Sequence, residues 1–177
     1  MSDIFDKAKS RVLDRIESPR DLVEFKLGAA LKMENTVLAM LGKLQDEARS
    51  GELKQQFAHH ADETGGQIEN LERAFGALGA EPDEKPCLVI EAIDKESKAN
   101  IKIAGDGMVD AVILSGAAET EHHEIAVYEG LIAHAEALGE QDVVTLLRQN
   151  LEQEQHTLEE VKQATQKTAH ELSGQAA

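Results

Sequence analysis

The amino-acid sequence predicts an all-α protein, built as an antiparallel four-helix bundle. Ala, Leu, Glu, Gln and Lys, which are good helix formers, dominate its 177 residues, whereas Gly (13), Pro (3) and aromatic residues (3%) are few. Apolar residues also recur every three or four positions over four long stretches, as one buried helix face requires. A chain of this length is sufficient for one domain with a substantial core.

Two long helices are predicted in the first half of the chain. The first spans residues 20–49 and the second residues 52–78, where Gly79 ends it. The expected inward positions are Val23, Leu27, Leu31, Leu38 and Leu41 in the first helix and Leu53, Phe57, Leu71, Phe75 and Leu78 in the second. Residues 1–19 form an N-terminal arm, and its sequence leaves open a short helix or a flexible segment.

The second half predicts a crossover followed by two more long helices. A shorter helix is expected within residues 86–103, because Pro86 suits a first helical turn. The third and fourth long helices are expected over 108–138 and 141–171, with apolar positions such as Ile113, Leu138 and Leu147 facing inward. A ferritin-like bundle has such a long crossover between helices two and three. The bundle therefore spans residues 20–172, and residues 173–177 form a flexible tail.

Polar residues interrupt the apolar stripe of each long helix near its middle. They are Glu34 in the first helix, His60 and Glu63 in the second, Glu121 and Glu124 in the third, and Glu154 in the fourth. Antiparallel packing would bring these midpoints to one level. Buried carboxylates without partners are costly, and a group of them takes up protons or binds a cation. The six residues therefore predict a site for two metal ions, iron or alternatively manganese, since oxygen ligands with imidazole suit both.

A different interpretation needs no metal. The polar core is then a hydrogen-bonded network in a non-enzymatic structural or interaction bundle, with Tyr128 as a core residue whose hydroxyl has a partner. Cys87 fits a small buried apolar residue under either interpretation. The sequence also leaves open whether a second imidazole joins the site. The candidates are His59, His122, His123 and His156, of which His122 and His156 are expected nearest to its level.

The charge balance excludes several classes of partner. Lys and Arg number 18 against 34 Asp and Glu, a formal net charge of -16, which disfavours binding to nucleic acid and to anionic membranes. We expect a cytoplasmic location, because the first residues lack a basic segment followed by an apolar run and because apolar stretches are too short for a membrane span. A single cysteine excludes an intrachain disulfide framework.

Two segments, Phe57–Glu69 and Glu121–Tyr128, resemble motifs of a known family, the YciF-like stress proteins of the ferritin-like superfamily. The segment Phe57–Glu69 resembles the family's F-x-x-H-x-x-E-T-x-x-Q-I signature, and Glu121–Tyr128 resembles its E-H-Y-E-I-A-x-Y segment. Leu151–Glu154 is similar to the family's L-E-E-E run. Shorter agreements at Asp21–Glu34 and Cys87–Glu91 extend the resemblance over residues 20–170, which is nearly the whole chain.

The resemblance implies a rubrerythrin-like bundle, a di-metal centre, a homodimer and an association with stress. It supports all six candidate ligands, but His123 replaces the family's usual Tyr, and His156 and Leu158 also depart from the pattern. A di-iron centre would oxidise iron or consume dioxygen or peroxide. The sequence contains no Cys-x-x-Cys module for electron delivery, so an external reductant would be needed. Catalytic residues are not assigned, and the sequence leaves open whether the protein is an enzyme.

Overall fold

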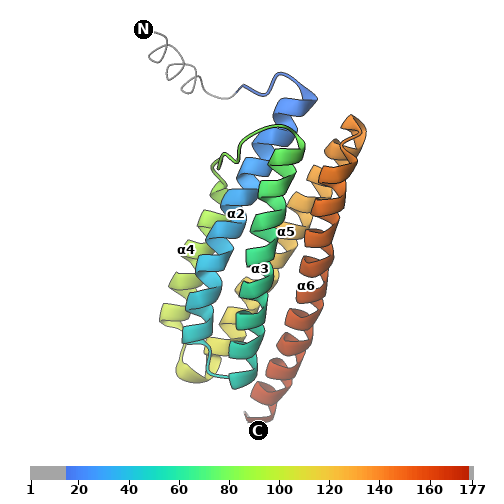
Figure 1. The fold of residues 1–177 in the computed structure, drawn as a ribbon. Helices are drawn as coiled ribbons and strands as arrows, with labels where there is room; N and C mark the ends of the chain where they lie inside the picture. Colours follow the sequence, from blue (N-terminus) through green and yellow to red (C-terminus); the bar gives the residue numbers. More distant parts are fainter. Residues whose placement is uncertain (1–14, 176–177) are drawn as a thin grey trace.

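The computed structural model describes residues 15–175, which form an antiparallel bundle of four long helices with a shorter helix on its outside (Figure 1). The predicted ferritin-like, all-α fold is confirmed, and the described residues contain no strand. The long helices are α2 (Pro19–Glu47), α3 (Gly51–Ala77), α5 (Val109–Leu138) and α6 (Gln141–Gln175). The crossover carries α4 (Leu88–Ile103) and a 3-10 turn, η1 (Asp106–Met108). Most of the predicted N-terminal arm, residues 1–14, lies outside the described residues.

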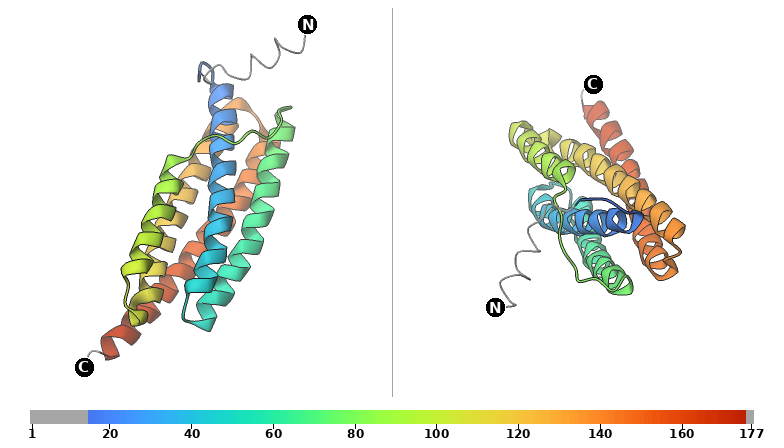
Figure 2. Two further views of the ribbon diagram at one scale, coloured as in Figure 1. Left: turned by 90° about the vertical axis from the view of Figure 1, so that its left-hand side faces the viewer. Right: turned by 90° about the horizontal axis from the view of Figure 1, so that it is seen from above.

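The four long helices enclose one core. Going round the bundle, α2 packs against α3, α3 against α6, α6 against α5 and α5 against α2. The additional helix α4 lies against α5 and α2, which the view from above also shows (Figure 2). Apolar residues of all four long helices fill the interior, and each helix therefore directs its middle turns toward the same central region.

Local signals in the sequence explain where the helices begin and end. Ser18 caps α2 through a reciprocal pair of bonds: its Oγ accepts from the Asp21 amide at 3.1 Å, and Asp21 Oδ2 accepts from the Ser18 amide at 2.9 Å. Gly79 and Gly139 follow α3 and α5 with φ of 69° and 77°, a left-handed conformation that glycine adopts without steric cost. Gly79 is the glycine that the sequence predicts as the end of the second long helix.

Some predicted details are wrong. The helix α6 continues to Gln175 instead of ending near residue 171, because Gln, Lys, Ala and Glu in its last turns favour the helix and Gly174 alone does not stop it. Residues 173–175 therefore belong to the helix, and residues 176–177 lie outside the described part of the chain. Leu138 is exposed at the end of α5, and Leu38 is only half-buried, since the neighbouring Val37 takes the core position.

The crossover is fixed in place at Gly28 of α2. The Lys85 amide donates to the Gly28 carbonyl at 3.0 Å, and a Cβ at Gly28 would lie only 2.3 Å from the Asp83 carbonyl oxygen. Real Cβ atoms essentially never come that close, so only glycine allows the connection to cross α2 here.

We therefore expect Gly28→Ala to destabilise the protein by about 1–3 kcal/mol, since the backbone of the crossover has to move away. The matched control is Gly42→Ala on the same helix, where a Cβ meets nothing within 4 Å. The control should gain up to about 1 kcal/mol from better helix propensity. Urea unfolding of both variants measures the difference, and equal effects would show that the crossover has no fixed path over α2.

Candidate metal centre

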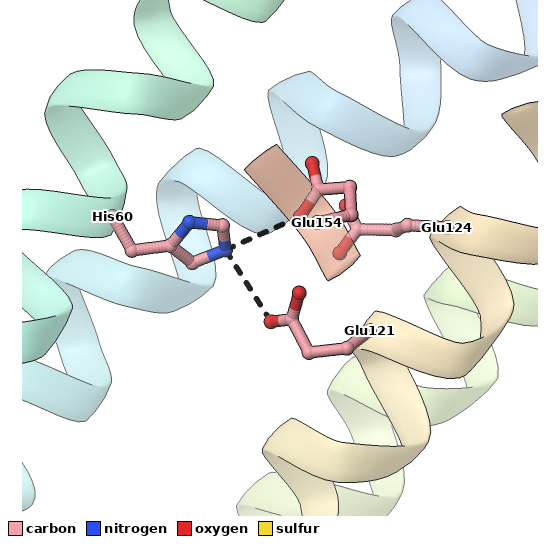
Figure 3. A group of neighbouring side chains, drawn as sticks. All are labelled: His60, Glu121, Glu124 and Glu154. Atoms are coloured by element: carbon pink, nitrogen blue, oxygen red, sulfur yellow. Dashed lines mark ion pairs between the residues drawn. The ribbon is translucent and has the colours of Figure 1, made fainter. Parts of the chain in front are cut away.

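Four polar side chains from three helices meet in the core (Figure 3). They are His60 of α3, Glu121 and Glu124 of α5, and Glu154 of α6, and all four are buried. Each offers one ligand atom, and these atoms lie within 4.8 Å of one another. His60 Nε2 is 3.3 Å from Glu121 Oε1 and 3.9 Å from Glu154 Oε2. The spacing of three residues on α5 places both of its carboxylates on the same inward face.

Glu34 of α2 completes the polar core beside this group. Its side chain is fully buried, and Oε1 accepts a hydrogen bond from the Tyr128 hydroxyl at 2.5 Å. The second oxygen, Oε2, has no hydrogen-bond partner. Glu34 and Glu124 lie close enough for each to change the pKa of the other. Carboxylates of α2, α5 and α6 therefore come together with the His60 imidazole, as the sequence predicts.

A buried amide chain orients Tyr128, and sequence reasoning missed its central member. Asn150 of α6 donates from Nδ2 to the Tyr128 hydroxyl at 3.0 Å and to the Gln67 carbonyl at 3.1 Å. Asn70 in turn donates to Asn150 Oδ1 at 2.8 Å. Since Asn150 donates to the hydroxyl oxygen, the phenolic hydrogen is available for Glu34. The helical spacing could have identified Asn150 as a core residue, because it lies three residues after the buried Leu147 and four before Glu154, on the same face of α6.

Glu63 takes a different place from the other predicted ligands. Its side chain is 19% exposed, and its Oε2 lies 3.8 Å from His60 Nδ1, the ring nitrogen opposite to the one that faces the carboxylates. Its Oε1 lies 3.6 Å from Nε2 of the exposed His59. Hydrogen bonding to His60 lowers the pKa of Glu63, so this carboxyl stays ionised at neutral pH. The structure places Glu63 at the rim, and its ligand role stays a prediction.

The other candidate histidines lie away from the four-residue group. His59 and His156 are 67% and 69% exposed at the side chain, and His122 is exposed as well. His123 is half-buried with its Nε2 3.6 Å from Cys87 Sγ, and burial together with the charge of Lys26 lowers its pKa. Among residues 15–175, His60 is thus the one imidazole of the group.

Burial and mutual repulsion set the protonation of the core. Burial raises the pKa of Glu124 and Glu154 well above the usual range, and the neighbouring carboxylates raise both further. For Glu34, burial raises the pKa while the Tyr128 hydrogen bond lowers it, and the result is about 7. Burial lowers the pKa of His60, but Glu121, Glu63 and Glu154 outweigh it and raise the value to about 10. Without a cation, the core therefore holds protons on several of its carboxyls and on His60.

The chemistry of this core fits a hard metal ion. Within the described residues, nine buried side-chain atoms have no hydrogen-bond partner, and seven of them belong to Glu34, His60, Glu121, Glu124 and Glu154. Buried polar atoms are normally satisfied, and each unsatisfied atom is costly. Here the atoms are carboxylate oxygens and an imidazole nitrogen, which are ligands for iron and manganese. The group can hold a metal ion with its existing side chains.

Comparison with known proteins identifies the family. A profile of the domain of unknown function DUF892 matches residues 18–173. The chain belongs to the DUF892 family. The match spans the whole bundle, from the cap of α2 to the last turns of α6, so the family and the fold describe the same part of the chain.

Relatives in the DUF892 family have the same fold. Protein YciF of Escherichia coli K12 is 31% identical over 126 residues, which is 70% of this chain and 76% of YciF. The crystal structure of the E. coli stress protein YciF superposes with a TM-score of 0.84 at 25% identity, covering 88% of this chain and 99% of that one. The structure of YcfI of Rhodopseudomonas palustris, whose description proposes a structural role, superposes with a TM-score of 0.82 at 33% identity. The match covers 85% of this chain and 97% of that one. The predicted YciF-like membership is thereby confirmed.

Within residues 15–175, no helix combines the length and the apolar character that crossing a bilayer needs.

Proposed function

We propose that this DUF892 protein is a di-metal protein that holds two iron ions, or alternatively two manganese ions, in the core of its bundle. One observation carries the proposal: the carboxylates of Glu34, Glu121, Glu124 and Glu154 and the His60 imidazole present seven atoms without a hydrogen-bond partner in a buried region. A hydrogen-bonded network built for its own sake would satisfy these atoms. Two divalent cations would satisfy them and would offset the repulsion between the carboxylates.

The five buried residues would hold the metal ions, and Glu63 is the sixth proposed ligand. A pair of ferrous ions, when bound, supplies two electrons for dioxygen or peroxide. The side chains of this chain supply charge compensation and orientation. Tyr128 fixes one oxygen of Glu34 and leaves the other free, and Asn150 holds Tyr128 in place. His60 must lose its proton before its Nε2 can bind a cation, so metal binding releases protons.

The E. coli relative is called a stress protein, and we extend that association to this chain as part of the proposal. Removal of ferrous iron together with dioxygen or peroxide limits oxidative damage, which suits such a role. An external reductant would return the metal pair to the ferrous state. The homodimer also stays a prediction, since the structure describes one chain.

Metal titration tests the proposal directly. Protein freed of metal with a chelator and titrated anaerobically with ferrous iron should bind two ions per chain, with release of protons into a weakly buffered solution. His60→Ala should reduce the stoichiometry or the affinity by at least about tenfold, since mutation of metal ligands and their neighbours costs this much. Glu63→Ala, measured in parallel, decides whether the rim carboxylate is a ligand. Absence of binding by the wild type would contradict the proposal.

A structural bundle without metal is the second candidate. The chain of hydrogen bonds from Asn70 through Asn150 and Tyr128 to Glu34 favours it, because this part of the polar core is satisfied without a cation. The description of YcfI points the same way. The two candidates differ in one result, since only the di-metal protein gains stability from iron.

A further inference from the structure

A narrow apolar cavity leads to the candidate metal centre along the inside of the bundle. Its volume is about 30 Å³, and it is lined by residues of α2, α3, α5 and α6. The walls are mainly aliphatic and aromatic, with Met40 and Leu44 of α2, Phe57 of α3, and Leu114 and Ala117 of α5. Two residues of the centre, His60 and Glu121, also line it, so the cavity reaches the ligands themselves.

The cavity has a polar edge toward solvent. Gln56 of α3 and Glu160 of α6 are half-exposed, whereas the other lining residues are buried. The two helices pack against each other, so this edge lies at the α3–α6 side of the bundle. A molecule from solvent would enter at this edge, and His60 and Glu121 lie in the wall of the same cavity.

We propose that this cavity is the access path and binding pocket for dioxygen, an inference that rests on the di-metal function. A cavity of about 30 Å³ admits a molecule with two heavy atoms. Dioxygen has no hydrogen bonds to lose in an apolar channel. Hydrogen peroxide is of similar size, but it would have to give up hydrogen bonds to water, and the walls would replace them only in part, at Thr120 and Thr157.

The site then uses dioxygen as the oxidant. A ferrous pair, when bound, would supply two electrons to dioxygen, and two protons from solvent would complete its reduction to hydrogen peroxide.

Ala117 is the position at which the path can be closed. It lies one helical turn before Glu121 on α5, its side chain is 6% exposed, and it lines the cavity. Ala117→Leu should fill the space, because a leucine side chain is larger than the free volume beside it. The matched control is Ala126→Leu, which makes the same change at an exposed position of the same helix. Val161→Ala removes bulk from the wall and should widen the path.

The first measurement uses xenon with the metal-free protein, so it does not depend on metal chemistry. Xenon is an apolar gas atom that occupies such cavities. We expect one xenon site between Phe57 and Leu114 in the wild type and in Ala126→Leu, greater occupancy in Val161→Ala, and none in Ala117→Leu. Circular dichroism confirms that each variant is folded. A wild type without bound xenon overturns the inference.

The second measurement uses protein loaded anaerobically with ferrous iron and mixed rapidly with dioxygen or with hydrogen peroxide. Ala117→Leu should slow oxidation by dioxygen roughly tenfold or more, as a raised barrier to access predicts, should slow the peroxide reaction less, and should leave the iron stoichiometry unchanged. Val161→Ala should accelerate the dioxygen reaction. An unchanged dioxygen rate in Ala117→Leu, or equal slowing of both oxidants, overturns the inference while the di-metal function stands. Failure of the wild type to bind iron overturns both.

Discussion

Replacing Glu154 with glutamine is expected to abolish the stabilisation of the protein by iron and to leave the metal-free protein at least as stable as the wild type. Glu154 is fully buried, and neither of its carboxylate oxygens has a hydrogen-bond partner. Glutamine keeps the shape and cannot ionise, a change that is often neutral or stabilising in the absence of the compensating ion. The wild type should gain about 2.7 kcal/mol when free iron is a hundredfold above its dissociation constant.

Thermal unfolding gives the measurement. A gain of that size corresponds to a rise in melting temperature of about 5–10 °C for a chain of this length. The matched control is Glu152→Gln, an exposed position on the same helix, which should keep the full response to iron. Equal melting temperatures of the wild type in iron and in chelator would end the di-metal hypothesis. If Glu154→Gln instead lowers stability equally with and without iron, Glu154 belongs to a satisfied structural network.

The metal-free protein is expected to lose stability as the pH rises from about 5 to 8. The folded-state pKa of Glu34 is about 7 against an ordinary value of 4.5, so folding opposes the ionisation of this carboxyl. The protonated Glu34 carboxyl contributes to the free energy of unfolding. This contribution is fully present below pH 4.5 and is lost as the pH rises through about 7. The full loss is about 3 kcal/mol for Glu34, at 1.36 kcal/mol for each pH unit between the two pKa values.

Other groups of the centre act in the same direction. Glu124 and Glu154 also have raised pKa values, and their contributions are lost as the pH rises through those values. His60 has a raised pKa of about 10, so its contribution is present below 6.5 and is lost as the pH approaches 10. Iron should reverse the trend, because the ligands must be deprotonated to bind it and affinity increases with pH.

Urea unfolding in chelator at several pH values tests this dependence. Glu34→Gln should flatten the curve by the contribution of one carboxyl. Glu47→Gln, at an exposed position of the same helix, should leave it unchanged. The prediction is contradicted if the stability of the metal-free wild type stays constant or increases between pH 5 and 8. The buried carboxyls would then ionise without cost. We do not expect this, because the carboxylate oxygens of Glu124 and Glu154 have no hydrogen-bond partners that would stabilise the ionised form.

The fold was predictable because its main signals are local. Gly79 and Gly139 end helices through their own conformation, and Ser18 begins one through a contact three residues away. The fixing of the crossover at Gly28 was not predictable, since it depends on the Asp83 and Lys85 backbone more than fifty residues later in the chain. The last turns of α6 contain good helix formers, but Ser173 and Gly174 signal a helix end, so the continuation to Gln175 was not predicted.

The polar core was predictable in composition but not in detail. Glu34 and Glu154 stand out because each interrupts an apolar stripe, and both are fully buried. Glu63 lies three residues after His60, a spacing that puts it on the same face of α3. Periodicity cannot distinguish the centre of a face from its edge, and the structure places Glu63 at the edge. Asn150 was missed because an amide without charge gives a weaker signal than a carboxylate, although it orients Tyr128.

The burial of Tyr128 also determines the optical properties of the molecule. The sequence contains one tyrosine and no tryptophan, so near-ultraviolet emission comes almost entirely from this one phenol. Its hydroxyl is bonded to Glu34, and its ring has no contact with solvent. The single intrinsic fluorophore therefore sits beside the carboxylates, where a paramagnetic ion would quench it. Tyrosine emission can therefore be used to follow changes in the core, such as metal binding, without an added dye.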